Sequence, residues 1–250
     1  MDCLESVDST NIRARELGFD GAPDGSVVLA EEQTRGRGRL GRDWVSPPHR
    51  NLYMSVLLRT DLPAEAISQI SLTAGLAACE TVAEWCPATL KWPNDVLVDR
   101  RKVVGILAEL ESRAGSRFVV LGMGVNVNMQ IFDLPRDLID KAGSLAIATG
   151  GQVDRAQVAG RLLANLESRY DQLRREGFAG IAEQWCLRSG FVGRQIRVSA
   201  VGGEAAGDVA SDVAGEVLGL APDGALCLKR SDGSEYRVVA GDVTVIDGYE

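Results

Sequence analysis

Four short β-prone segments follow one another between residues 89 and 128, and they limit the possible folds more than any other feature of the sequence. Short polar turns at 99–101 and 113–116 separate the last three segments. Strands joined by so few residues pair antiparallel, because a parallel pair needs a crossover of about a dozen residues or more. The region therefore predicts an antiparallel meander. Its expected strands are 89–92, 96–99, 103–110 and 118–128.

Helical patterns lie on both sides of this meander. Asp154 with Gln157 resembles a capping box, so we expect a long helix to begin there. Ser9-Thr10-Asn11 offers N-cap side chains for a short helix that Gly18 would end. The apolar face of the long helix is expected to comprise Val158, Leu162, Leu166, Tyr170 and Leu173. Further helices are expected over 64–85 and 178–185, and further strands over 1–8, 25–32 and, with alternation, 51–59.

The texture of the sequence changes after Ser189-Gly190. Short β segments follow, separated by turn signals at 202–203, 222–224 and 232–233. We therefore expect an α+β protein with two parts. Residues 1–189 would form a mixed β-sheet flanked by helices, and residues 190–250 a small β-barrel. Residues 191–250 carry five more acidic than basic residues, so this part is no basic nucleic-acid module.

The residue census excludes several classes of protein. A net charge of −8 disfavours general nucleic-acid binding, and no apolar run is long enough to span a membrane. The acidic N-terminus is unlike a signal peptide, and five scattered cysteines without a CxxC pair are typical of reduced thiols. We expect a cytoplasmic protein. Its single histidine, His49, follows two prolines and is expected on a surface loop, which leaves no multi-histidine zinc site.

Gly36-Arg37-Gly38-Arg39-Leu40-Gly41-Arg42 is the most unusual stretch, because with Arg35 it holds four arginines within eight residues of an acidic chain. It formally matches a dinucleotide-binding fingerprint, but Pro47-Pro48 follows in place of a helix. Glycines let backbone amides approach an anion, and arginine forks suit phosphate and carboxylate. We interpret the stretch as an anion-clamping loop. A solvated basic loop and an RNA-contacting segment are the alternatives.

Two further stretches carry groups suited to ligands. Lys91-Trp92-Pro93-Asn94-Asp95 must turn at its proline, and Lys102 follows seven residues after Asp95. Both lysines could reach phosphate and Asp95 could hold a metal ion, although a surface turn would have the same pattern. Gly122-Met123-Gly124-Val125-Asn126-Val127-Asn128 has glycines inside an apolar strand, which indicates a ligand or another backbone close by. A bulged core strand capped by its asparagines is the alternative.

Together these stretches resemble biotin protein ligases over nearly the whole chain. The likeness runs from 8–11 through 31–33, the 36–42 loop, Trp44 and 91–95 to 102–107 and 122–126, and ends in the small C-terminal part. It implies a mixed sheet with helices, followed by an SH3-like barrel. It also implies two half-reactions: biotin and MgATP form biotinyl-5′-AMP and pyrophosphate, and a lysine of a biotin carboxyl carrier protein domain then takes the biotinyl group.

The resemblance assigns a role to each stretch. It makes Lys102 and Arg39 the catalytic pair, with Lys102 bridging the biotin carboxylate and the α-phosphate. Asp95 and Asn126 would lie at the Mg²⁺ ion. Biotin would be bound by Ser9, Thr10, Asn11, Gln33, Arg37, Gly38, Arg39, Lys102, Gly105, Gly122 and Gly124. The nucleotide would be bound by Gly36, Arg37, Arg39, Arg42, Trp44, Lys91, Asn94 and Asn126.

Two other functions have to be weighed. A lipoate-type ligase shares the adenylate chemistry, but the 36–42 loop and 91–95 together favour biotin. A non-catalytic RNA-binding module is disfavoured by the net charge of −8 and by the lack of aromatic residues for base stacking beside the loop.

Some family members also bind DNA through an N-terminal helix-turn-helix. Because the first motif begins by residue 9, we expect an enzyme without DNA binding, and the resemblance is compatible with a homodimer. Arg35 departs from the small residue that is frequent there.

Overall fold

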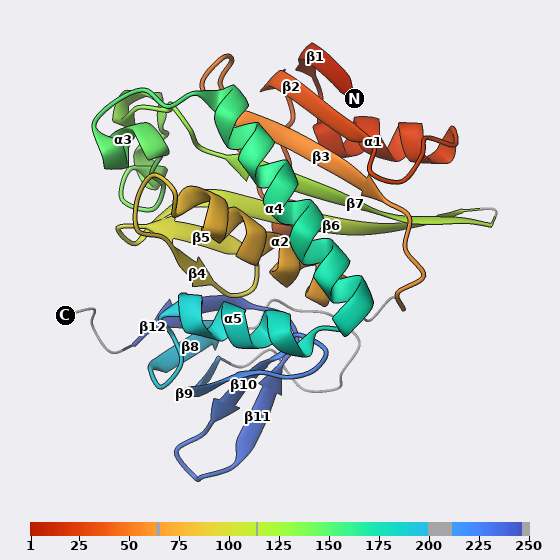
Figure 1. Ribbon diagram of the computed structural model, residues 1–250. Coiled ribbons are helices and arrows are strands. Elements are labelled where there is room, and N and C mark those ends of the chain that lie inside the picture. The colour runs from red at the N-terminus through yellow and green to blue at the C-terminus, as the bar shows by residue number, and fades with distance from the viewer. Residues whose placement is uncertain (64–65, 114, 200–211, 247–250) are drawn as a thin grey trace.

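The computed structural model describes residues 1–63, 66–113, 115–199 and 212–246. Its main feature is a seven-stranded mixed sheet in the order β1-β2-β3-β7-β6-β5-β4 (Figure 1). β1 and β2 pair in parallel, whereas the other neighbouring strands of this sheet pair antiparallel. The predicted meander is confirmed, since β4 to β7 follow one another across the sheet. The strands are β1 (Asp2–Val7), β2 (Val27–Gln33), β3 (Leu52–Leu58), β4 (Thr89–Lys91), β5 (Asp95–Val98), β6 (Arg101–Arg113) and β7 (Ser116–Val125).

Helices cover both faces of this sheet. α1 packs against β2, β3 and β7 on one face, and α2 and α4 lie together on the other, as Figure 1 shows. α4 begins as predicted, since the Asp154 side chain accepts hydrogen bonds from the backbone N–H of Ala156 and Gln157. Its buried face consists of the five residues expected from the helical spacing. The helices are α1 (Thr10–Phe19), α2 (Ile67–Val82), α3 (Leu145–Thr149), α4 (Arg155–Glu176) and α5 (Ala179–Ser189).

Two local expectations were wrong, and a third, the N-cap of α1, was right in its position only. β3 does not alternate: all seven of its residues are buried, because helices cover both of its faces. Gly18 does not end α1, which continues to Phe19. A side chain at Gly18 would meet the Phe118 ring, so this glycine serves helix-to-sheet packing. Ser9 is the N-cap residue of α1, but its side chain makes no cap hydrogen bond. Ala64, where the second helix was expected to begin, lies outside the described residues.

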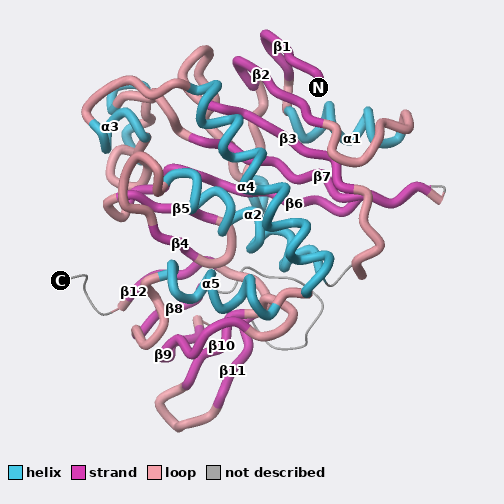
Figure 2. Tube along the Cα trace, in the orientation of Figure 1, coloured by secondary structure: helices cyan, strands magenta, loops and turns pink. Residues whose placement is uncertain are grey.

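The C-terminal part is a second, five-stranded antiparallel sheet in the order β11-β10-β9-β8-β12 (Figure 2). The turns predicted at 222–224 and 232–233 join β9 to β10 and β10 to β11. The turn predicted at 202–203 lies outside the described residues. The fold is therefore α+β, with a mixed helix-covered sheet followed by a small antiparallel one. The second sheet comprises β8 (Gln195–Ser199), β9 (Val213–Leu220), β10 (Leu226–Lys229), β11 (Glu235–Val238) and β12 (Asp242–Val245).

The turn at 222–224 ties the second sheet to the first part of the chain. Trp92 Nε1 donates a hydrogen bond to the Gly224 carbonyl oxygen over 3.1 Å, although Trp92 itself is buried. From α2, Ser68 Oγ donates to the Asp223 carbonyl over 2.5 Å. The second sheet thus packs against the edge of the first sheet that β4 forms. Over the ranges that are described, the structure has no helix both long and apolar enough to cross a bilayer.

Candidate active site

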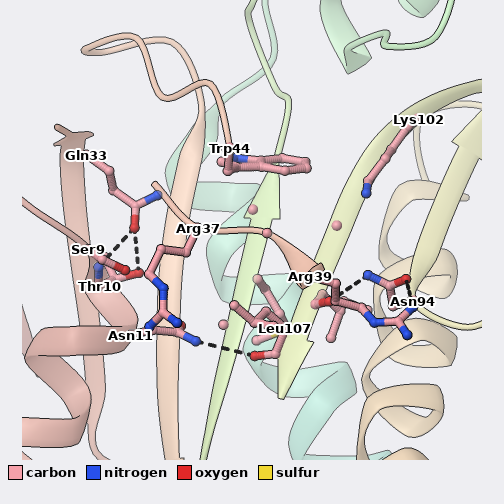
Figure 3. A pocket seen from close by; sticks show the side chains of 16 residues that line it. Ser9, Thr10, Asn11, Gln33, Arg37, Arg39, Trp44, Asn94, Lys102 and Leu107 are labelled. Carbon is pink, nitrogen blue, oxygen red and sulfur yellow. Dashed lines mark hydrogen bonds between the residues drawn. The ribbon is translucent and has the colours of Figure 1, made fainter. Parts of the chain in front are cut away.

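A small pocket of about 40 Å³ lies on the α1 face of the large sheet (Figure 3). Its wall combines the N-terminal end of α1, the end of β2, the arginine–glycine loop and the central strands β6 and β7. All eleven residues predicted to bind biotin line it. It is lined by Ser9, Thr10, Asn11, Gln33, Arg37, Gly38, Arg39, Trp44, Asn94, Lys102, Gly105, Ile106, Leu107, Gly122, Met123 and Gly124.

The polar end of this pocket is a preorganised hydrogen-bond network. The Gln33 side-chain oxygen accepts from Thr10 N over 2.9 Å and from Thr10 Oγ1 over 3.1 Å. Ser55 Oγ lies 2.7 Å from Asn11 Oδ1 and 2.8 Å from Thr10 Oγ1. Ser9, Thr10 and Asn11 are all buried. Because the Ser9 hydroxyl is not spent on capping α1, it can bond a neutral polar ligand in the pocket.

The floor of the pocket is made of glycine. Gly105 of β6 pairs directly with Gly124 of β7, and the indole of Trp44 lies over both. A Cβ atom on Gly105 would come within 2.6 Å of Trp44 Cζ3, so the ring needs these glycines to lie flat on the sheet. Figure 3 shows the Trp44 ring above the strands. Trp44 Nε1 is buried and has no hydrogen-bond partner among the residues that the structure describes. The indole ring of Trp44 therefore covers the backbone of Gly105 and Gly124.

Lys102 lies where the pocket meets a larger cavity of about 400 Å³, and it lines both. Its Nζ is 2.6 Å from Asp95 Oδ1 and 5.3 Å from the centre of the Trp44 ring system. The segment that precedes α3 also holds the backbone of Lys102, since Lys102 N donates to the Lys141 carbonyl over 2.7 Å. A cation fixed between two cavities can bridge two anionic groups that arrive from opposite sides.

The larger cavity is lined by six basic and four acidic side chains, so its lining carries a modest positive charge. The loop supplies Arg39 and Arg42, and β4 supplies Lys91. Arg39 Nη1 donates to Asn94 Oδ1 over 3.1 Å. Burial lowers the pKa of the Arg39 guanidinium, while the carboxylates of Asp242 and Asp95 oppose that shift. A partly desolvated guanidinium gains most from an incoming anion, so this cavity suits a polyphosphate.

Most residues predicted for the nucleotide lie in this cavity, but two do not. Arg39, Arg42, Trp44, Lys91, Asn94 and Asn126 line it, whereas Arg37 lines only the small pocket. Gly36 lines neither cavity; it packs inside the loop, where a side chain would collide with the Trp44 carbonyl and the Ser46 hydroxyl. Its role is to let the loop pack on itself.

The two residues predicted near a metal ion differ in what they offer. Asp95 faces the larger cavity through a carboxylate that forms an ion pair with Lys102. Asn126 is buried, and its amide is already engaged with Asn51 and the Gly143 carbonyl. In the ranges that the structure describes, no cluster of three or more His, Cys, Asp or Glu side chains could hold a metal ion. Any metal here would need ligands from the substrate as well as Asp95.

Several polar residues of the site were missed from the sequence, including Asp43, Arg100, Asp140 and Lys141, which line the larger cavity. Ser55 on β3 and Glu109 on β6 bond to Asn11, and Asn51 orients Asn126. Asp242 on β12 reaches the larger cavity and forms an ion pair with Arg42 of the loop. The lone Ser55 among apolar strand residues was a usable signal. Asp242 had none, because nothing local shows that the second sheet closes the cavity.

His49 was interpreted correctly, as it is exposed and beside Glu5 and Glu31.

Known proteins resemble this chain in sequence and in structure. The model of the biotin/lipoate A/B protein ligase family matches residues 3–126. The biotin–[acetyl-CoA-carboxylase] ligase of Mycobacterium tuberculosis is 38% identical over 254 residues, which cover 97% of this chain and 88% of that protein. The bifunctional ligase/repressor BirA of Bacillus subtilis is 34% identical over 240 residues, or 95% of this chain and 71% of that protein.

Among solved structures, the biotin protein ligase from Aquifex aeolicus in complex with biotin and ATP has a TM-score of 0.80 and 29% sequence identity. The match covers 97% of this chain and 96% of that chain. It includes the large mixed sheet and the small antiparallel one, so the likeness extends over both parts of the molecule. On the strength of these similarities and of the site described above, the chain belongs to the biotin protein ligases of the biotin/lipoate A/B protein ligase family.

Proposed function

We propose that this chain activates biotin with ATP and transfers it to a protein. Biotin and ATP form biotinyl-5′-AMP and pyrophosphate. A lysine of the biotin carboxyl carrier protein domain of a biotin-dependent carboxylase then attacks the mixed anhydride, takes the biotinyl group and releases AMP. The observation that carries this proposal is the place of Lys102, which lines both the small pocket, with its neutral polar end, and the larger cavity, in which basic side chains outnumber acidic ones.

The small pocket suits the bicyclic head of biotin. The ureido group is neutral and needs both donors and acceptors, which Ser9, Thr10, Asn11 and Gln33 supply at the polar end. The glycines of β6 and β7 let the Trp44 ring and the Asn11 amide lie close to the backbone, so that these two side chains would border the bound ring system. Arg37, Gly38 and Arg39 border the pocket from the loop side, where the ligand must enter.

The charges at the junction suit adenylate formation. The biotin carboxylate attacks the α-phosphate, so two anions must be held together while further negative charge develops. Lys102 would lie between them. Arg39, Arg42 and Lys91 would bind the nucleotide phosphates in the larger cavity, with Asn94 holding Arg39 in place. Trp44 would cover the junction and, together with the loop, limit the hydrolysis of the adenylate by water.

Mg²⁺ would enter with ATP. One carboxylate is enough for this ion, since Mg²⁺ commonly takes one or two carboxylates and completes its coordination shell with substrate phosphates and water. Asp95 is the carboxylate that the larger cavity offers at its junction with the pocket. A magnesium ion there would neutralise phosphate charge. Asn126 would support the cavity wall and is not proposed as a direct ligand, because its amide is already bonded.

Further parts of the proposal concern partners and place. Residues 1–189 would form the ligase domain and 190–250 an SH3-like domain that completes the nucleotide cavity through Asp242. The protein would work in the cytoplasm, alone or as a homodimer, and would not bind operator DNA. A salt-sensitive, sequence-specific gel shift would overturn the last statement.

The decisive test is exchange of labelled pyrophosphate into ATP by the purified protein with Mg²⁺. We expect exchange with biotin and none with lipoate, which separates the two branches of the family. Exchange with lipoate alone would assign the other acid. If neither acid supports exchange while RNA binds tightly in a filter assay, the loop binds nucleic acid and the proposed reaction is wrong.

A further inference from the structure

Glu109 of β6 lies behind the small pocket and connects two groups that belong to different parts of the site. Its Oε2 accepts a hydrogen bond from Asn11 Nδ2 over 2.7 Å. Its Oε1 lies 3.1 Å from Arg37 Nη2 in an ion pair. The two carboxylate oxygens thus serve two separate donors, one on the rigid wall and one on the loop. The side chain is only 25% exposed, so water does not readily replace either partner.

On the wall, this carboxylate fixes the orientation of an amide. Asn11 Oδ1 faces the Ser55 hydroxyl, and the amide packs where a side chain on Gly122 would otherwise lie. Because Glu109 is only an acceptor, the Asn11 NH₂ group must point toward it and the Asn11 oxygen toward Ser55. Asn11 therefore presents one defined hydrogen-bonding pattern at the polar end of the pocket.

On the loop, the same carboxylate supplies an anchor. The loop is mostly held by its own hairpin, since Gly38 N donates to the Arg42 carbonyl over 2.7 Å and Trp44 N to the Gly36 carbonyl over 2.9 Å. Those bonds close the loop on itself and do not attach it to the sheet. Side chains make that attachment: Arg39 bonds to Asn94, the Trp44 ring packs on the strands, and Arg37 reaches Glu109. In Figure 3 the Arg37 side chain extends from the loop toward Asn11.

We propose that Glu109 is a positioning residue that couples closure of the arginine–glycine loop to the shape of the small pocket. It holds Arg37 with one oxygen and sets the Asn11 amide with the other. Binding in the pocket and ordering of the loop thus depend on one carboxylate. The inference rests on the proposed function for its ligand, biotin, but not for the contact between loop and sheet.

The test is Glu109→Gln, which keeps the size of the side chain but leaves one acceptor oxygen for two donors. We expect the KM for biotin in pyrophosphate exchange to rise about tenfold with a smaller change in kcat, and biotinyl-5′-AMP to leave about tenfold faster. Glu111→Gln is the matched control. Glu111 lies two residues further along β6, and its ion pair with Arg15 at 4.0 Å involves neither loop nor pocket. Equal KM and release rates in both variants and the wild type would overturn the proposal.

A second measurement needs no substrate. Limited chymotrypsin cleavage after Leu40, which is exposed in the loop, reports how firmly the loop is held. Cleavage should be several-fold faster in Glu109→Gln and unchanged in Glu111→Gln. In an Arg37→Gln background, Glu109→Gln should add little, because the anchor is already lost. Unchanged cleavage, or a fully additive effect in the double variant, would refute the loop anchor. If the protein does not catalyse the proposed reaction, the cleavage rates still test the contact between the loop and the sheet, because they need no substrate.

Discussion

Gly105→Ala tests whether the glycine floor is needed for ligand binding. The new methyl carbon would lie 2.6 Å from Trp44 Cζ3 and 2.9 Å from Lys102 Cε. Carbon atoms in contact normally stay roughly 3.5–4.0 Å apart, so about 1 Å must be gained. Gly105 is paired with Asp95 on one side and with Gly124 on the other, so the strand is held and the Trp44 ring must move.

The cost falls on the closed site. Overpacking of this kind costs about 1–3 kcal/mol, and about 1.4 kcal/mol corresponds to a tenfold change in affinity. We therefore expect biotin to bind about tenfold or more weakly by calorimetry, while the thermal melting temperature changes little, because a loop absorbs the strain. Gly160→Ala on α4 is the control, since a side chain there meets open space. Wild-type affinity for biotin in Gly105→Ala would refute the role of the glycine floor.

Other residues give sharper tests of charge and burial. Lys102→Ala should abolish biotin-dependent pyrophosphate exchange and leave the circular dichroism spectrum unchanged; normal exchange would reject its bridging role. Arg39→Ala should release biotinyl-5′-AMP several-fold faster in a dissociation assay, because a partly buried cation is lost from the larger cavity; an unchanged rate would count against a closing loop. Burial raises the pKa of the Cys79 thiol from 9.0 to about 12, so only the unfolded chain ionises this thiol just above pH 9. The free energy of unfolding should fall by up to about 1.4 kcal/mol per pH unit above pH 9, and urea titrations of Cys79→Ala should show a shallower decline. Gly160→Ala should itself stabilise the fold by about 0.5–1 kcal/mol in the same titrations, and a loss would show that the position is not a freely exposed helix site.

The elements that could be predicted from the sequence are those whose signal is local. The face of α4 follows from helical spacing and the start of α4 from Asp154, because both depend on neighbours within a turn or two. The meander of β4 to β7 follows from short connections. The parallel pairing of β1 with β2 did not follow, since it joins strands separated by the whole of α1.

The same division holds for the site. The glycine-rich and lysine-containing stretches stood out because their residue types are unusual where they stand, whereas Ser9, Thr10 and Gln33 were predicted from the resemblance to biotin protein ligases. Glu109 was missed: an acidic residue in a strand is ordinary until Asn11 and Arg37, far apart in the sequence, are known to face it. Arg37 was expected at the nucleotide as well, but its length lets it turn back to the sheet. Side-chain reach across the fold is not encoded in local spacing.

The contact between Trp92 and Gly224 affects how this protein can be divided. Removing everything after residue 189 would take away the Gly224 carbonyl and expose the Trp92 indole to water, and losing the burial of a large apolar side chain costs about 1.5–3 kcal/mol. It would also uncover α5, which packs against β9. Since whole proteins are stable by only about 5–15 kcal/mol, such a fragment would start close to its unfolding limit. The two sheets should therefore melt in one shared transition. Fusion tags are better placed at the chain ends, and the junction near residue 189 is a poor place to divide the protein.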